Sequence, residues 1–234
     1  MASMGEMIGN IAHQWRQPLS LISTVSSGLK FKYEMGTFNE KEYVSSLEKI
    51  LESTNYLSNT IDDFRNFFKT DKEVVEFSIQ SVITKSINLM GNSFTSDNVS
   101  LELNINNQLV IGYENELLQS LLNILNNAKD ALKEKEDNKV IIISTDIIND
   151  ILRINIQDSA GGVPQDIINK IYEPYFTTKH QSQGTGIGLY MTKEIIVKHM
   201  NGQIEVSNTE FEYNNNKLTG ALFSISIPLK LQKV

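Results

Sequence analysis

The sequence predicts an α plus α/β protein in which a helical hairpin precedes an α/β sandwich. Residues 1 to about 72 repeat apolar positions in alternating steps of three and four, the period of long amphipathic helices. After that point short β-rich runs alternate with helical ones, as they do in layered α/β structures. We therefore place two domains, at residues 1–72 and 73–234.

The composition fits two such domains and excludes several kinds of site. The chain has 234 residues, 40% of them apolar, which is enough for a real core. Its 21 Lys and Arg against 28 Asp and Glu give a net charge of −7, so we expect no nucleic-acid partner. The absence of cysteine excludes disulfides, zinc ribbons and thiol nucleophiles, and three histidines leave little for a His-rich metal site.

The sequence shows no targeting or membrane signal. No apolar stretch approaches the roughly 18 residues that span a bilayer, and the N-terminus lacks a signal-peptide pattern. We expect a cytoplasmic chain with no membrane segment of its own.

The first domain is expected to be two long helices separated by a break at residues 36–39. The apolar positions of the first helix are Ile8, Ile11, Trp15, Pro18, Ile22, Val25 and Leu29. Those of the second helix are Tyr43, Leu47, Ile50, Thr54, Leu57, Ile61, Phe64 and Phe68. Two helices alone bury little of so long a seam, so we expect a second copy to complete a dimeric four-helix bundle. Packing against the rest of the same chain is the alternative.

The second domain alternates helices and strands. Helices are expected over residues 78–90, 114–135 and from 188 to about 200. Strands are expected over residues 99–105, 139–148, 151–157, 203–207 and 221–228, with turn signals at Asn149-Asp150 and around Asn214.

His13 is the first candidate for chemistry. If Ile8 opens the heptad, His13 falls at the sixth position and faces away from the seam, so we expect it to be exposed. A lone histidine there is usually only a solvated surface residue. Pro18, however, cannot donate to the carbonyl of Gln14 and should kink the helix, and such a cost often marks function. An exposed neutral imidazole can attack a phosphoryl group.

Three polar residues of the long helix in the second domain share one face. Asn123, Asn127 and Asp130 lie at i, i+4 and i+7. They form either a solvated polar stripe or a hydrogen-bonding and cation-coordinating site. Neutral oxygen ligands suit a Mg²⁺ ion that is bound mainly through nucleotide phosphates.

Two glycine-rich segments complete the candidates. Asp158 follows an apolar strand and precedes Gly161-Gly162, where a carboxylate either opens a turn or accepts from an exocyclic amine such as that of adenine. The run Gly184-Thr185-Gly186-Ile187-Gly188-Leu189 opens a helix, where backbone N–H groups can approach phosphate oxygens. It lacks the preceding strand of a dinucleotide fingerprint and the lysine of a Walker loop. The polar stretch before it is typical of a mobile lid.

Taken in order, these motifs resemble the catalytic portion of two-component sensor histidine kinases. The matching motifs are His-x-x-Arg-x-Pro, Asn-x-x-x-Asn, Asp-x-x-Gly-Gly, Tyr-Glu-Pro-Tyr-Phe-Thr-Thr-Lys and Gly-Thr-Gly-Ile-Gly-Leu. The resemblance covers almost the whole chain. It implies that residues 1–72 are the dimerisation and phosphoacceptor domain. Residues 73–234 would then be the Bergerat-type ATP-binding domain shared with certain chaperones, topoisomerases and mismatch-repair ATPases.

The resemblance also implies roles for single residues. His13 would be the phosphoacceptor, with Gln14 and Arg16 beside it in the catalytic motif. Asn127 would bind Mg²⁺, and Asp158 would accept from the adenine amine. The other implied ATP-binding residues are Asn123, Asp130, Gly162, Phe176, Lys179, Gly184, Thr185, Gly186, Ile187, Gly188 and Leu189. The implied cofactors are ATP and Mg²⁺, and the implied partner is the receiver domain of a response regulator, which takes the phosphoryl group on an aspartate.

Several positions depart from the family pattern. Gln14 stands where an acidic residue is usual, Gln17 where threonine or asparagine is, and Ser159 and Ala160 where asparagine and glycine are. Asn123 occupies the position of the glutamate that activates water in the related ATPases, and an amide cannot act as a general base. We therefore expect a kinase, either free in the cytoplasm or as the cytoplasmic portion of a longer membrane-bound sensor. The alternatives are an ATPase of the same superfamily and a nucleotide-binding pseudokinase scaffold.

Overall fold

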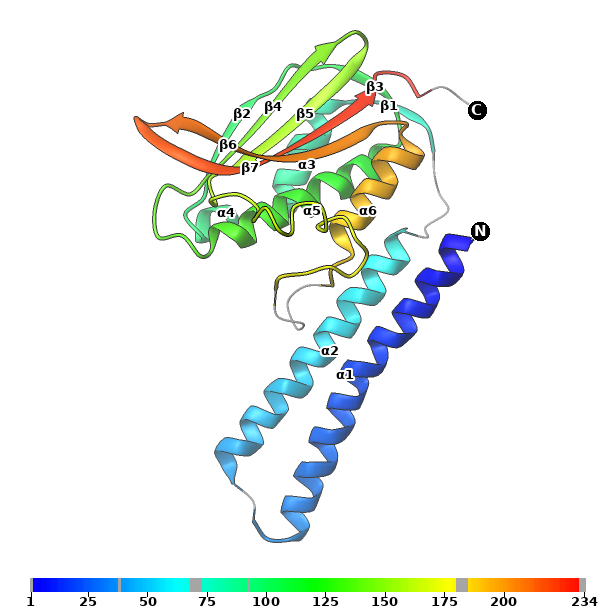
Figure 1. Ribbon diagram of the computed structural model, residues 1–234, viewed down its shortest axis with the longest axis vertical. Coiled ribbons are helices and arrows are strands. Elements are labelled where there is room, and N and C mark those ends of the chain that lie inside the picture. Colours follow the sequence, from blue (N-terminus) through cyan, green and yellow to red (C-terminus); the bar gives the residue numbers. More distant parts are fainter. Residues whose placement is uncertain (1, 38, 68–72, 92, 180–184, 232–234) are drawn as a thin grey trace. The chain divides into compact units, whose positions relative to one another are not determined.

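The computed structural model describes residues 2–37, 39–67, 73–91, 93–179 and 185–231. Within these ranges the description does not extend to the side chains of residues 2–14, 59–60, 62–67 and 93. The chain divides into two compact units, Met1–Lys69 with Thr177–Thr185 and Thr70–Phe176 with Gly186–Val234. Figure 1 shows a helical N-terminal region followed by an α/β domain, which confirms the predicted fold class.

Two long helices, α1 (Ala2–Glu34) and α2 (Glu40–Phe67), form the hairpin of the first unit. Helix α1 is uninterrupted, with Pro18 inside it. Its predicted seam is confirmed where side chains are described. The seam residues there are half-buried, and all other described α1 side chains are exposed. The half-buried residues are Trp15, Pro18, Ile22, Val25 and Leu29.

The predicted seam of α2 is only partly correct. Ile50 and Leu57 are half-buried as expected, but other seam positions are exposed, namely Tyr43, Leu47, Thr54 and Ile61. Ser46 and Ser53 take inner positions instead. A single neighbouring helix covers only a narrow stripe, and small serine side chains allow α1 to approach closely along it. The side chain of Phe64 and the whole of Phe68 lie outside the described part.

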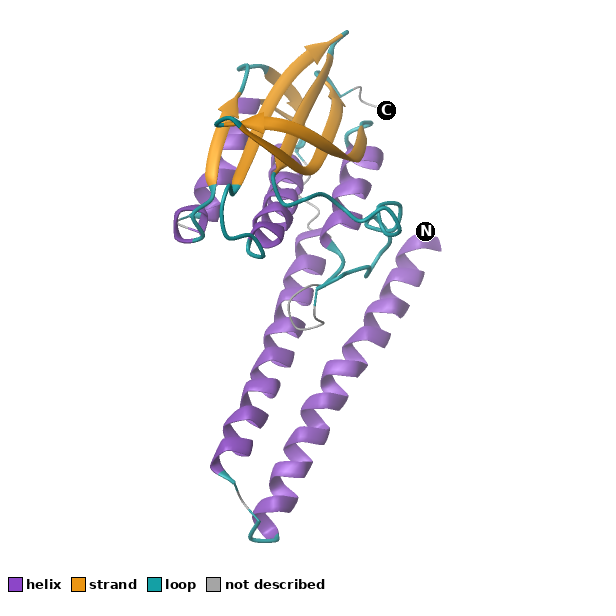
Figure 2. Cartoon of the chain, turned by 60° about the vertical axis from the view of Figure 1, so that its left-hand side comes forward, coloured by secondary structure: helices purple, strands orange, loops and turns teal. Residues whose placement is uncertain are grey.

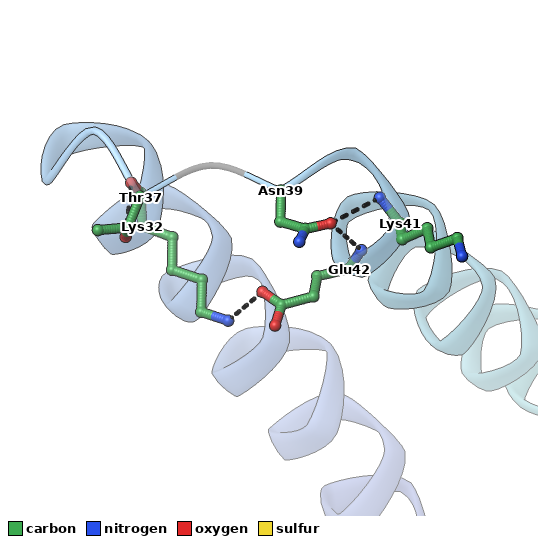
Figure 3. A network of polar contacts seen from close by, with 5 residues as sticks. All are labelled: Lys32, Thr37, Asn39, Lys41 and Glu42. Carbon is green, nitrogen blue, oxygen red and sulfur yellow. Dashed lines mark hydrogen bonds and ion pairs between the residues drawn. The ribbon is translucent and has the colours of Figure 1, made fainter.

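Local polar contacts fix the turn of the hairpin at the predicted break (Figure 3). Gly36 has φ +69°, the left-handed conformation that commonly ends a helix. Asn39 caps α2, since its Oδ1 accepts the backbone N–H groups of Lys41 and Glu42 at 3.0 and 3.3 Å. Lys32 near the end of α1 forms an ion pair with Glu42 near the start of α2.

The second unit is built on a five-stranded sheet of order β2-β4-β5-β7-β6. Its strands are β2 (Ser100–Asn104), β4 (Val140–Ile148), β5 (Ile151–Asp158), β6 (Gln203–Tyr213) and β7 (Asn216–Pro228). Strands β2 and β4 are parallel, and the other neighbours are antiparallel. A separate antiparallel pair, β1 (Val75–Ser78) and β3 (Leu109–Gly112), was not predicted, because four-residue strands leave too short a pattern to detect.

Helices cover one face of this sheet, as Figures 1 and 2 show. They are α3 (Ile79–Met90), the short α4 (Ser93–Ser96), α5 (Glu114–Leu132), α6 (Gly188–Glu194) and the π-helical η1 (Ile195–His199). The core lies between the layers, where Leu121 and Ile124 of α5 and Ile143 and Ile154 of the sheet are fully buried. The opposite face carries half-buried polar side chains, which include Ser144, Asn155, Gln157, Ser224 and Ser226. The result is a two-layer α/β sandwich.

Strand ends differ most from the prediction in the last hairpin. Strands β6 and β7 extend well beyond residues 207 and 221, and their ladder continues to the pair Tyr213–Asn216. Asn214 and Asn215 both have positive φ, as a two-residue hairpin turn requires. The sequence underestimated the length of these strands because the residues near the tip are mostly polar. An antiparallel sheet tolerates such residues on a solvated face. In the described part of the chain, no helix is both long and apolar enough to cross a membrane.

Candidate functional site

The predicted polar face of α5 lies against the start of α6. Asn123 donates its side-chain amide to the Gly188 carbonyl at 3.1 Å and to Thr192 Oγ1 at 3.2 Å. The Thr192 hydroxyl in turn donates to the Gly188 carbonyl at 2.9 Å. Asn127 and Asp130 are half-buried farther along the same face. This amide therefore holds the first turn of α6 to the middle of α5.

Asp158 ends β5 as a buried carboxylate with 4% of its surface exposed. Its Oδ1 accepts the backbone N–H of Ala160 at 2.8 Å and that of Ala221 at 3.1 Å. Burial raises the pKa of Asp158 above its ordinary value, while these two hydrogen bonds and the charge of Lys135 oppose the rise. Within the described residues, Oδ1 accepts both of these hydrogen bonds. Oδ2 is therefore the oxygen that could accept from an N–H donor of a ligand.

Backbone packs so closely around Asp158 that glycine is required beside it. A Cβ at Gly220, on β7, would lie 1.6 Å from the Asp158 carbonyl oxygen. The sequence did not point to Gly220, because the expected strand began only at residue 221. Within the observed β7 it is an isolated glycine, which is a signal of close backbone approach. The carboxylate therefore sits at a point where β5 and β7 leave no room for a side chain between them.

The turn after Asp158 is held by a residue that the sequence did not single out. Asn208 on β6 accepts the Val163 N–H at 2.7 Å through Oδ1 and donates Nδ2 to the Val163 carbonyl at 2.7 Å. Gly162 has φ +90°, and a Cβ there would lie 2.5 Å from Asn208 Oδ1. Asn208 stands 45 residues from Val163 in sequence, so no local pattern signals this clamp.

A second close approach fixes the glycine run. Gly186 has φ +64°, and a Cβ there would lie 2.4 Å from the Tyr175 carbonyl carbon. The Tyr175 N–H donates to the Gly186 carbonyl at 2.9 Å. Ile187 is buried, and Phe176 and Leu189 pack half-buried against the core. Gly186 thus allows the backbone to bring residue 175 to the entrance of α6.

The remaining predicted residues are placed unevenly. Thr185 and Lys179 are half-buried, and the Lys179 N–H donates to Thr177 Oγ1 at 3.1 Å. Arg16 is exposed on α1. The side chains of His13 and Gln14 lie outside the described part, although their backbone belongs to α1, and Gly184 lies outside it entirely. The described candidates that belong to the α/β unit lie at three places: the polar face of α5, the end of β5 with the turn after it, and the start of α6.

Two family models match the chain. Residues 3–73 match the His Kinase A (phospho-acceptor) domain. Residues 112–231 match the family described as histidine kinase-, DNA gyrase B-, and HSP90-like ATPase, and this segment is half of the chain. Every described candidate of the α/β unit lies within the second match.

Curated relatives match over nearly the whole chain. A Rickettsia typhi protein named as an NtrY-like sensor histidine kinase is 26% identical over 222 residues, which are 94% of this chain and 35% of that protein. The signal transduction histidine-protein kinase AtoS of Escherichia coli is 27% identical over 234 residues, 99% of this chain and 36% of AtoS. The chain thus spans about a third of the length of these relatives.

Solved structures share the fold. The catalytic domain of histidine kinase ThkA is 26% identical, with a TM-score of 0.57 over 68% of this chain and 97% of that one. ThkA in complex with the response regulator TrrA covers 100% of this chain and 64% of that one, with a TM-score of 0.71 and 22% identity. The second likeness extends the shared fold to the helical hairpin.

Proposed function

The chain belongs to the histidine kinase-, DNA gyrase B-, and HSP90-like ATPase family, and from this premise we propose that it is the catalytic portion of a dimeric protein histidine kinase. In this proposal a ring nitrogen of His13 takes the γ-phosphoryl group of ATP and ADP leaves, and the N–P bond then breaks as the phosphoryl group passes to an aspartate of a response regulator receiver domain. Residues 1–72 serve as the dimerisation and phosphoacceptor domain, and residues 73–234 bind ATP.

The observation that carries the proposal is the Asp158 carboxylate. It is buried, its Oδ1 already accepts two backbone N–H groups, and the missing side chains of Gly220 and Gly162 let the surrounding backbone and Asn208 pack closely around it. Such a carboxylate can accept a hydrogen bond from the exocyclic amine of adenine through its other oxygen. A buried acceptor of this kind discriminates strongly against ligands that lack the matching donor, because it would then stay unpaired.

The donor set on α5 fits Mg²⁺ as a companion of the nucleotide. Asn127 and Asp130 carry half-buried side-chain oxygens on the face that also carries Asn123, and Lys133 Nζ donates to Asp130 Oδ1 at 2.7 Å. Oxygen ligands in small number suit Mg²⁺, which keeps several waters and takes its other ligands from phosphates. When bound, the ion would neutralise charge on the transferring phosphoryl group. We propose Asn127 as its protein ligand.

The chain's own residues favour transfer to histidine over hydrolysis. Asn123 uses its amide N–H groups to hold Gly188 and Thr192, and an amide is no general base for water. His13 lies in the segment that matches the phosphoacceptor domain. A neutral imidazole nitrogen there supplies the nucleophile, and Gln14 can accept from its other ring N–H and fix the tautomer.

Exposed apolar residues on the hairpin support a homodimer. The described side chains of this kind include Leu19, Leu21, Phe31, Tyr43, Val44, Leu47, Leu51 and Ile61. A soluble chain rarely leaves so much apolar helix surface in contact with water, and a second copy would bury it in a four-helix bundle. ThkA, which shares the hairpin and the α/β fold, was solved with a response regulator, and we propose a partner of the same class.

The share of the related proteins that the chain covers supports a proposal about where it acts in the cell. Because the chain spans about a third of the related sensor kinases, we propose that it acts as the cytoplasmic catalytic part of a longer sensor.

Incubation with γ-labelled ATP and Mg²⁺ tests the proposal. We expect label on the protein that is labile in acid and stable in base, and we expect His13→Ala to abolish it. Label that persists in His13→Ala would overturn the acceptor assignment. Release of labelled phosphate without labelled protein would instead identify an ATPase.

A further inference from the structure

The loop that follows α5 is anchored on the strand end that carries Asp158. Helix α5 ends at Leu132, earlier than the sequence pattern predicts, and the chain then turns toward β4. Within this turn Lys135 donates its Nζ to the carbonyl of Ser159 at 2.7 Å. Lys135 is half-buried, and it lies 24 residues before Ser159 in sequence. A charged donor at this distance makes one of the stronger kinds of protein hydrogen bond.

Ser159 ties the same strand end to the loop a second time. Its side chain is fully buried, and its hydroxyl donates to the Asn138 carbonyl at 2.6 Å and accepts the Val140 N–H at 3.0 Å. Its own N–H donates to the Val140 carbonyl at 3.1 Å. Ser159 therefore has its N–H, hydroxyl and carbonyl all engaged by the segment from Lys135 to Val140. The residue directly before it is Asp158, so this network fixes the backbone next to the carboxylate.

We propose that Lys135 is a positioning residue for adenine recognition, which holds the Ser159 carbonyl and thereby sets the Asp158 carboxylate for the adenine amine. This inference rests on the proposed function and adds to it a residue outside every motif of the sequence. Asp158 makes the contact with the base, and Lys135 acts through Ser159.

Besides holding the Ser159 carbonyl, Lys135 affects Asp158 through its positive charge. Among the described residues, Lys135 is the charged side chain that influences the carboxyl of Asp158, and its positive charge lowers the pKa of that buried acid. The flanking strands present apolar neighbours: Ile141 of β4 pairs with Asp158, and Ala221 of β7 donates its N–H to it. Lys135 therefore both orients the acceptor and favours its ionised form.

Nucleotide binding to the full chain tests this inference, with two probes that differ only in the amine. Affinities for ATP and for purine riboside triphosphate, which lacks the exocyclic amine, are measured by calorimetry with Mg²⁺. We expect Lys135→Gln and Lys135→Met to weaken ATP binding about tenfold and to change binding of the amine-free nucleotide less than about twofold. Two uncharged replacements keep the test valid if one of them fails to fold.

Matched variants separate positioning from general destabilisation. Lys135→Arg keeps a charged donor and should restore most of the preference for ATP. Lys217→Gln makes the same charge change at an exposed lysine paired with Glu210, and it should leave both affinities unchanged. Equal losses for both nucleotides in Lys135→Gln, or no loss for either, would overturn the inference. A wild-type chain that binds neither nucleotide would instead overturn the proposed function.

Discussion

Asp158 concentrates the chemistry of the site in one side chain. Burial raises its pKa above the ordinary value, so the folded protein favours the protonated form more than the unfolded chain does. Its contribution to stability is therefore fully present below the ordinary pKa and is lost as the pH rises through the folded-state value. Near neutral pH the fold carries the cost of a buried carboxylate that a ligand donor can offset.

Nucleotide affinity should follow the ionisation of this carboxyl. We expect the affinity for ATP to fall on acidification with a midpoint above 3.8, because protonation places a hydrogen where the adenine amine would donate. Calorimetric titrations from about pH 4 to pH 8 measure it. Asp158→Asn should bind weakly and lack this acid limb, which separates it from the titration of the phosphates. A wild-type profile that coincides with that of Asp158→Asn would contradict the assignment.

Gly220 is packed so tightly against Asp158 that adding a side chain there should destabilise the fold. We expect Gly220→Ala to destabilise the α/β unit by about 2 kcal/mol or more, because the new Cβ must displace the Asp158 backbone. Urea unfolding followed by circular dichroism measures the change. Gly112→Ala is the control, since its Cβ would meet Met200 and Phe77 at ordinary distances of 3.5 and 3.9 Å. Equal stability of the two variants would show that the strands can separate at no cost.

Helix α5 connects the core and the site because one of its faces is apolar and buried, whereas another carries polar residues that face α6. Buried Leu117, Leu121 and Ile124 fix its rotation against the sheet, and this rotation directs Asn123 toward α6. The position of α6 then depends on one side chain that donates two hydrogen bonds. The element that brings the glycine run to the site is therefore held by a polar contact, on top of its own apolar packing.

Replacing that donor tests the role of the element. We expect Asn123→Asp to destabilise the contact between α5 and α6 by about 2 kcal/mol, because a carboxylate cannot donate to the Gly188 carbonyl. Faster hydrogen exchange in α6 and slower autophosphorylation are the measurements. Asn126→Asp makes the same charge change at an exposed position of α5 and should leave both unchanged. Unaltered exchange in Asn123→Asp would show that apolar packing alone holds α6.

At the scale of the whole molecule, the hairpin offers more apolar surface than one chain buries. Trp15, Ile22 and Leu29 of α1 are half-buried in the hairpin, whereas Leu47 and Leu51 of α2 are 37% and 61% exposed. Leu47 and Leu51 are four residues apart and share one helix face. That face is the surface we assign to the second copy.

Charges on this face should separate the dimer. We expect Leu47→Glu combined with Leu51→Glu to shift the chain from dimer to monomer at micromolar concentration, since each buried carboxylate would lack a partner. Sedimentation velocity measures the change. Leu109→Glu, at a residue of β3 that is 54% exposed, is the control and should stay dimeric. A monomeric wild-type chain would contradict the dimer itself.

The sequence predicted most of the architecture because the relevant signals are local. Periods of three to four and of two residues located the two long helices, α3, α5 and strands β2, β4 and β5, and Asn149-Asp150 marked a turn in which both residues have positive φ. It also singled out Asp158, Gly162 and Gly186, since glycines and a carboxylate in a turn are recognisable by type. The site roles assigned to these residues remain predictions.

Only the tertiary structure decided which groups support the site. Lys135, Asn208 and Gly220 lie 24, 45 and about 60 residues from the groups they contact, so no periodicity connects them. The sequence by itself determined the helices, most strands, the family motifs and the candidate residues. Backbone preferences and residue type depend only on the residue itself and its neighbours in sequence. How Asp158 is held, why Gly220 cannot carry a side chain and what fixes α6 follow from strand pairing and helix packing, which bring distant residues within hydrogen-bonding distance.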